Sequence, residues 1–381
     1  MNTETYQYVP LPTEPPTEYA PTDRWVPDIL GAGFEARTLP LGMDDEGEVV
    51  ATVVRYRPQQ DPNAIAGTPQ RPGFAVLYLH GWNDYFFNRE IARHFSYAGG
   101  AFYAIELHKY GRSLRPGQTI FYTRSIADYD AEISAAFDLI VAENPGLPLL
   151  FGAHSFGGLV APLWVHHNPG RVEALLLNSP WIAMQGSLVE RSGATVLGET
   201  LGIAVPHQTV PITPSNGYPL LLAGWQAADG PIPQNLRRWE WDPSLSGYGL
   251  VADWKREENA DITAGWGRAV VHGQREIRHG IETGVPTLLM CARHSDLHSR
   301  WHPQMHRMDT VLDADRIASR APKLGSEVTI RRLFGRHDLF ISLPPDRIRV
   351  WRTVHSWLAA RMPGAVPLAD LQPAGIDAIC P

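Results

Sequence analysis

Short apolar runs that alternate with stretches of helical pattern constrain the fold of this chain more than any other feature. Each run is continuously apolar, which is the pattern of a strand covered on both faces. The six runs are residues 74–79, 102–105, 147–151, 172–177, 286–290 and 328–330. Because strand–helix–strand repeats form right-handed crossovers, the runs predict an α/β fold with a mostly parallel central sheet flanked by helices.

Two local patterns add detail to this expected sheet. Residues 36–41 and 49–54 are two β-rich stretches around a polar turn, which predicts an antiparallel hairpin ahead of the parallel strands. The strongest helical pattern covers residues 125–144. Ser125 and Asp128 form a capping-box pattern at its start, so the helix is expected to begin there.

Residues 184–281 interrupt the alternation of strands and helices. This stretch carries five of the chain's twelve tryptophans, together with many glycines and prolines. Since a structureless loop of that length is improbable, we expect an inserted cap over the carboxyl edge of the sheet, with at least one tryptophan facing the site. The core is then residues 23–183 and 282–381, and the proline-rich residues 1–22 form an extended or disordered arm.

The chemistry is concentrated in a serine motif after the third apolar run. Residues 151–158 read Phe-Gly-Ala-His-Ser-Phe-Gly-Gly, between an expected strand and an expected helix. This is the context of a nucleophile elbow, in which small residues flank a serine held in a strained turn. Gly157 satisfies that rule and Ala153 replaces the usual glycine. Ser155 is therefore the expected nucleophile, at a helix N-terminus that favours a developing oxyanion.

A base and an acid should follow the serine in the order acid, then histidine. His337 lies in a loop after the last expected strand, and an imidazole has the pKa range needed to accept the serine proton. Two acids are candidates. Asp296 lies shortly after residues 286–290, and Asp309 lies 28 residues (337 − 309) before His337. The spacing alone leaves both open.

The expected oxyanion hole is built from two backbone N–H groups. Trp82 follows His80-Gly81 at the end of the first parallel strand, and Phe156 follows the nucleophile. These are the two positions that supply the donors in folds with a nucleophile elbow. His80 is expected to hydrogen-bond the loop, and His154 to pack inside the elbow.

Five segments together resemble the α/β-hydrolases of the monoacylglycerol lipase and lysophospholipase (serine-aminopeptidase-like) type. They are residues 77–87, 104–113, 151–158, 309–325 and 335–340, and the match covers roughly residues 73–358. The resemblance implies that Asp309 is the acid, because relatives carry Asp-x-apolar-apolar before the penultimate helix. It also implies a serine carboxylesterase or lipase-like hydrolase with a lid, acting on a hydrophobic ester such as a monoacylglycerol or lysolipid. Neither metal nor organic cofactor is needed for such acyl transfer.

Other readings of the same residues stay open. A serine nucleophile also serves a C–C bond hydrolase, an acyltransferase, a peptidase or a perhydrolase, and the fold also occurs in non-catalytic binding proteins. A second motif places histidines at every fourth position, and its members are His294, His298, His302 and His306. On a continuous helix these four histidines would share one face, which could bind a metal. Pro303 interrupts that helix, so a solvated insertion is the favoured interpretation.

Composition excludes several classes of protein. Lys and Arg total 33 against 40 Asp and Glu, a net charge of −7, which disfavours nucleic acid as a partner. The two cysteines, Cys291 and Cys380, exclude a disulfide scaffold and a cysteine-ligated zinc site. The first residues show no basic stretch followed by an apolar run, so no secretory signal is visible. No apolar run reaches the ~20 residues of a membrane span. A cytoplasmic enzyme without stable membrane insertion is expected; the oligomeric state is left open.

Overall fold

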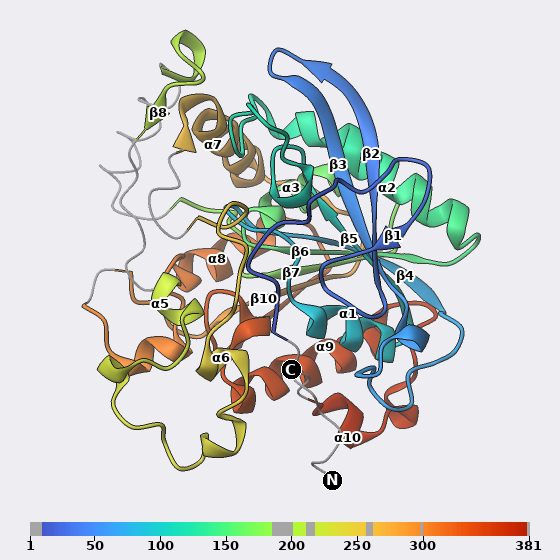
Figure 1. Ribbon diagram of the computed structural model, residues 1–381, viewed down its shortest axis with the longest axis vertical. Coiled ribbons are helices and arrows are strands. Elements are labelled where there is room, and N and C mark those ends of the chain that lie inside the picture. The colour runs from blue at the N-terminus through green and yellow to red at the C-terminus, as the bar shows by residue number, and fades with distance from the viewer. Residues whose placement is uncertain (1–9, 185–200, 211–217, 257–261, 298–299, 379–381) are drawn as a thin grey trace.

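A nine-stranded sheet forms the centre of the computed structural model, which describes residues 10–184, 201–210, 218–256, 262–297 and 300–378. Its strand order is β1-β2-β3-β5-β4-β6-β7-β10-β11 (Figure 1). The strands from β5 to β11 in that order pair in parallel. The first three strands pair antiparallel, and β3 joins them to β5. The predicted α/β fold with a mostly parallel sheet is confirmed.

Each parallel strand contains or overlaps one of the predicted apolar runs. Their bounds are β4 Phe74–Leu79, β5 Gly100–Glu106, β6 Leu149–His154, β7 Ala174–Asn178, β10 Thr287–Ala292 and β11 Val328–Leu333. All residues of β4, β6, β7 and β10 are buried, which explains their continuous apolar sequence. Strand β11 lies at the edge and is only partly covered, so its apolar run is short.

The predicted hairpin is present and longer than the sequence pattern indicates. It consists of β2 Phe34–Asp44 and β3 Gly47–Tyr56, with the short β1 Val26–Pro27 paired to β2. Its turn end projects beyond the rest of the sheet (Figure 1). None of the residues added at that end, 42–44 and 47–48, is buried, so they add nothing to an alternating pattern of buried apolar positions.

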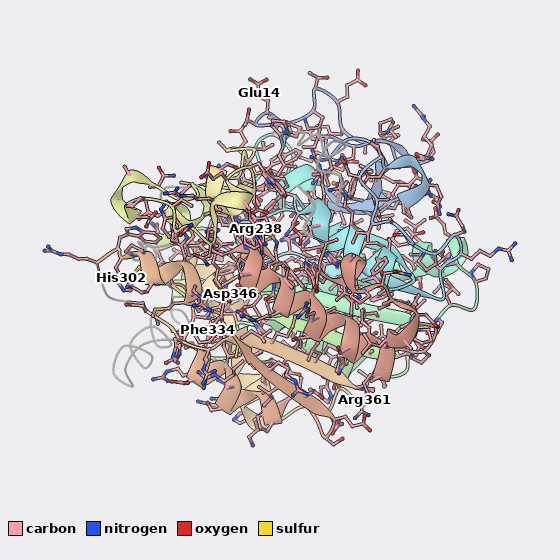
Figure 2. The ribbon with its side chains drawn as sticks, turned by 90° about the horizontal axis from the view of Figure 1, so that it is seen from below. Glu14, Arg238, His302, Phe334, Asp346 and Arg361 are labelled. Carbon is pink, nitrogen blue, oxygen red and sulfur yellow. The ribbon has the colours of Figure 1, made fainter. Side chains whose placement is uncertain are left out.

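Helices cover both faces of the sheet. Their bounds are α1 Arg89–Tyr97, α2 Asp130–Glu143, α3 Gly157–His167, α8 Ala314–Arg320, α9 Pro344–Arg361 and the short α10 Pro373–Ile376. Helices α1 and α9 share one hydrophobic core cluster, whereas α2, α3 and α8 contribute to another. Figure 2 shows α9 along the sheet, with Asp346 near its start and Arg361 at its end. Each face of the sheet therefore has its own core.

The predicted helix over residues 125–144 begins with a short 3₁₀ turn, Ile126–Tyr129, and continues as α2. The capping box is present: Ser125 Oγ accepts from Ala127 N, and the Asp128 carboxylate accepts from Ser125 N. Since the first N–H groups of a helix have no partner inside it, this cap stabilises the start.

Replacing Ser125 with alanine removes the hydroxyl of this cap. We expect Ser125→Ala to lower the free energy of unfolding by about 1 kcal/mol, as N-cap losses do. Urea unfolding followed by circular dichroism measures this loss. Ser319→Ala, at an exposed serine late in α8, is the control. Equal stability of the two variants would contradict the capping role.

The predicted cap region, called the insertion below, lies between β7 and β10 in the chain and consists of short elements and one long helix. In its described part these are β8 Thr209–Val210, α5 Tyr218–Leu222, α6 Pro243–Ser246, β9 Ile262–Thr263 and the long α7 Ala264–His279. Strands β8 and β9 form a separate two-stranded sheet. Trp266 of α7 is buried, and its ring lies 5.1 Å from that of Phe156. The insertion therefore contacts the residue that follows Ser155.

Buried arginines connect this region to the core. Arg347 of α9 pairs with Asp242 just before α6 and, at 3.0 Å, with Glu90 of α1. Arg336 donates from its guanidinium to the carbonyl oxygens of Leu221 and Ser244, at 3.0 and 2.7 Å. Because a buried guanidinium without acceptors is costly, these contacts fix the insertion against the core.

Residues 10–22, within the predicted arm, contain no helix or strand and lie along the core. Thr38 on β2 donates to the carbonyl oxygens of Ala20 and Pro21, and Tyr19 packs under the guanidinium of Arg115. In the described part of the chain, no helix combines the length and the apolar character needed to cross a bilayer.

Candidate active site

Ser155 occupies a tight turn between β6 and α3, and its φ of +51° lies in the left-handed region. A serine in that region is strained, and the strain holds its side chain out of the turn. The N–H of Ser155 donates to the carbonyl oxygen of Asn178 at 3.0 Å, and its own carbonyl oxygen accepts from Trp181 N at 2.8 Å. The backbone of residues 178–181, at the end of β7, therefore holds the turn.

The two glycines after the turn are required by close approaches. A Cβ on Gly157 would lie 2.4 Å from the carbonyl oxygen of His80, and one on Gly158 would lie 2.5 Å from the Cβ of Pro180. Real Cβ atoms do not come so close to other heavy atoms. The doubled glycine thus lets α3 start against the ends of β4 and β7.

Ser155, His337 and Asp309 form one hydrogen-bonded chain. The Ser155 Oγ lies 2.9 Å from His337 Nε2, and His337 Nδ1 lies 2.9 Å from Asp309 Oδ2. All three side chains are buried, with 8%, 3% and 0% of their surface exposed. With the proton of neutral His337 on Nδ1, the imidazole donates to the carboxylate and can accept the serine proton on Nε2.

The structure separates the two candidate acids. Asp309 contacts His337, and its other oxygen, Oδ1, accepts from the N–H groups of Val311 and Leu312 at 2.8 and 2.7 Å. Asp296 instead contacts His302, with 3.0 Å between its Oδ2 and Nε2 of the histidine. The carboxylate beside His337 is thus the one in the Asp-x-apolar-apolar pattern, whose apolar residues supply the backbone donors.

Asn178 is part of the site and was not identified from the sequence. It ends β7, is fully buried, and holds Ser155 N–H on its backbone oxygen. Its side chain donates to Asp338 Oδ1 at 2.7 Å and accepts from Leu339 N at 3.2 Å. Asn178 therefore joins the serine turn to the loop that carries His337. A polar residue at the carboxyl end of an apolar run was the available signal.

The two expected oxyanion donors lie beside the serine turn. Phe156 is the N-cap residue of α3, and a Cβ on Gly81, just before Trp82, would lie 3.2 Å from the Ser155 Cβ. Among the turn, loop and cap hydrogen bonds of the described residues, none runs from the N–H of Phe156 or Trp82 to a backbone carbonyl. The oxyanion role of both groups therefore stays a prediction.

The side chains of His80 and His154 are buried beside the serine turn. His80 Nδ1 lies 2.7 Å from the Gly81 carbonyl oxygen and its Nε2 accepts from Leu107 N, so the ring fixes the loop as expected. Burial lowers the pKa of His80 to about 4. Burial, reinforced by nearby His337, also holds the pKa of His154 well below its usual range. Both rings are therefore neutral near pH 7.

The histidines at every fourth position do not lie together on one helical face. His302 pairs with Asp296, while His306 accepts from Arg336 and stacks on Trp225. His294 packs against Phe334, and His298 lies outside the described residues. In the described part of the chain, the group that could hold a metal ion is elsewhere: it comprises His166, His167 and Glu276, on the surface between α3 and α7.

Comparison with known proteins agrees with this architecture. The family model described as serine aminopeptidase, S33, matches residues 70–247. Lysophospholipase L2 of Escherichia coli K12 is 23% identical over 263 residues, which cover 66% of this chain and 68% of the relative. The monoacylglycerol lipase of Mycolicibacterium smegmatis is 23% identical over 258 residues, which cover 66% of this chain and 83% of the relative.

Solved structures show the same fold. The monoacylglycerol lipase of Paleococcus ferrophilus aligns with a TM-score of 0.51 at 19% identity, covering 76% of this chain and 95% of that one. A carboxyl esterase from Bacillus coagulans aligns with a TM-score of 0.55 at 13% identity, and the alignment covers 86% of this chain and 98% of the esterase. The sheet and the serine turn are those of an α/β-hydrolase. The chain therefore has the α/β-hydrolase fold and resembles the serine-aminopeptidase-like monoacylglycerol lipases and lysophospholipases, so the predicted resemblance is confirmed.

Burial of Asp338, next to His337, has a measurable consequence. Desolvation raises the pKa of the Asp338 carboxyl to about 6, although hydrogen bonds from Phe340 N and Asn178 act in the opposite direction. Between the unfolded value near 4 and this folded value, the folded state binds more protons than the unfolded one. The contribution of Asp338 to stability is thus present at low pH and lost as pH rises to about 6.

We expect Asp338→Asn to remove this loss, so the variant gains stability relative to wild type between about pH 4 and pH 6. Above that window the difference should stay constant. Urea unfolding at a series of pH values measures it. A difference that does not vary with pH would show that Asp338 titrates as an ordinary carboxyl.

Proposed function

We propose that this protein is a serine hydrolase that cleaves a hydrophobic carboxylic ester through an acyl-enzyme. The observation that carries the proposal is the hydrogen-bonded chain from Ser155 through His337 to Asp309. A hydroxyl, an imidazole and a buried carboxylate in this order are the parts of a nucleophile activated by a general base. The named relatives, a lysophospholipase and monoacylglycerol lipases, support an ester as the substrate.

The reaction proceeds in two steps. Ser155 Oγ attacks the ester carbonyl carbon while His337 Nε2 accepts the serine proton, and the imidazolium then protonates the departing alcohol. Asp309 keeps the His337 proton on Nδ1 and stabilises the cation. Water, deprotonated by His337, next attacks the acyl-enzyme, and the carboxylic acid leaves as Ser155 regains its proton. The N–H groups of Trp82 and Phe156 stabilise the oxyanion in both steps.

Aromatic side chains around the serine favour a hydrophobic acyl group. Trp266 contacts the rings of Trp82, Phe156 and Trp181 at centroid distances of 5.6, 5.1 and 5.8 Å. The ring of Phe121 also lies 5.9 Å from that of Trp82. Such a cluster lowers the local polarity, which suits an alkyl or aryl ester better than a small polar one.

Hydrolysis of p-nitrophenyl acetate through decanoate tests the proposal. Ser155→Ala should reduce kcat by on the order of 10⁴–10⁶ because the nucleophile is lost. Wild-type activity should be higher with medium chains than with acetate, owing to the aromatic cluster. A Ser155→Ala variant as active as wild type would reject the mechanism. A folded wild type without ester turnover would point to C–C cleavage or binding.

A pair of acid variants tests the role of Asp309. Asp309→Asn should lower kcat by on the order of 10⁴, since an amide donating to His337 Nδ1 favours the wrong tautomer. Asp296→Asn is the matched control, because its carboxylate contacts His302 and not His337. It should retain wild-type kcat. If Asp296→Asn were the inactive variant, the acid would be misassigned.

A further inference from the structure

The loop from Gly81 to Asp84, which carries the Trp82 N–H, has no helix or strand to support it. It leaves β4 after His80, and Asn83 within it has a left-handed φ of +50°. The indole Nε1 of Trp82 is buried without a hydrogen-bond partner in the described residues, so it does not fix the loop. Something outside the loop must therefore hold the Trp82 N–H in place.

Asn83 is clamped to the insertion by two hydrogen bonds. Its side-chain Nδ2 donates to the carbonyl oxygen of Arg256 at 2.6 Å, and its Oδ1 accepts from the N–H of the same residue at 2.8 Å. The amide thus satisfies both backbone groups of one residue, which defines position and orientation together. Arg256 is 173 residues further along the chain.

Two residues that neighbour this clamp, Asp84 after Asn83 and Lys255 before Arg256, form a buried ion pair. Lys255 Nζ lies 2.8 Å from Asp84 Oδ1, and both side chains are buried, with 5% and 7% of their surface exposed. The same ammonium donates to the carbonyl oxygen of Asn83 at 3.4 Å. Nearby, Val251 N donates to the hydroxyl of Tyr85 at 3.1 Å. A buried pair with additional acceptors favours a single arrangement of the groups that it joins.

We propose that segment 251–256 of the insertion positions the oxyanion loop, with Asn83, Asp84 and Lys255 as positioning residues for the Trp82 N–H. This inference rests on the proposed function. It assigns the insertion a part in acyl transfer beyond covering the site. Trp266 packs against Trp82 from α7, so a second part of the insertion holds the same residue by its ring.

The physical basis is preorganisation. An oxyanion donor stabilises the transition state only if it points at the developing charge before the reaction, and small displacements of such groups lower the rate strongly. Since the contact strengthens in the transition state, a loosened loop lowers kcat more than it raises KM. A segment that merely covered the site would chiefly change KM.

Asn83→Gly is the principal test variant. Glycine accepts the left-handed backbone of this position without strain, so the substitution removes the clamp and leaves the turn possible. The double variant Asp84→Asn, Lys255→Met removes the ion pair without leaving one buried charge unpaired. His207→Ala is the control, because His207 joins the insertion to the β2–β3 turn through Asp45 and Glu46, at 3.6 and 3.5 Å.

The measurements are kcat and KM for a p-nitrophenyl ester, the second-order rate of inactivation by a fluorophosphonate, and thermal unfolding. For Asn83→Gly and for the double variant we expect kcat and the inactivation rate to fall by on the order of 10- to 100-fold, with KM within about threefold of wild type. His207→Ala should keep the wild-type kcat. Thermal unfolding identifies any variant whose fold is lost.

Two results would overturn the proposal while leaving the proposed function intact. One is a folded Asn83→Gly variant with wild-type kcat and inactivation rate. The other is a loss that appears only in KM. Failure of the proposed function has a different signature: folded wild type would show neither ester turnover nor reaction with the fluorophosphonate, and the positioning role would fall with it.

Discussion

The strained backbone of Ser155 is the constraint around which the rest of the site is arranged. A serine at a φ of +51° costs on the order of 1–3 kcal/mol, and the surrounding structure must hold it there. Asn178 does so from β7, and Gly157 allows α3 to begin against the carbonyl of His80. The same turn directs the Ser155 hydroxyl to His337. The parallel sheet acts as the rigid support for one unfavourable residue conformation.

Buried charge extends this support to the insertion. Arg336, beside His337, is fully buried and reaches two carbonyl oxygens of the insertion, and burial lowers the pKa of its guanidinium to about 10. Arg347 bridges Asp242 and Glu90 in the same manner. Removing one member of such a group leaves another unpaired in the interior, which is strongly destabilising. The insertion is thereby coupled to the residues that surround the serine.

The sequence is sufficient to predict what depends on local pattern. Residues 74–79 coincide with β4 because burial on both faces demands a continuous apolar run. The predicted helix N-cap at Ser125 is confirmed, because a capping box depends only on residues that are neighbours in the chain. The position of Asn178 at the end of an apolar run was a usable signal, but its role was not predictable, because it arises where the end of β7 meets a loop 160 residues further along the chain. The clamp from Asn83 to Arg256 is equally long-range, and neither residue type signals it.

The most direct test of the account is to find which residue a fluorophosphonate modifies in the folded wild-type protein. An activated serine reacts with such a probe, whereas an ordinary hydroxyl does not. Peptide mass spectrometry should find one equivalent of phosphonate on Ser155, and no labelling in His337→Ala. Labelling of a different residue, or none in folded protein, would contradict the claim that Ser155 is a nucleophile activated by His337.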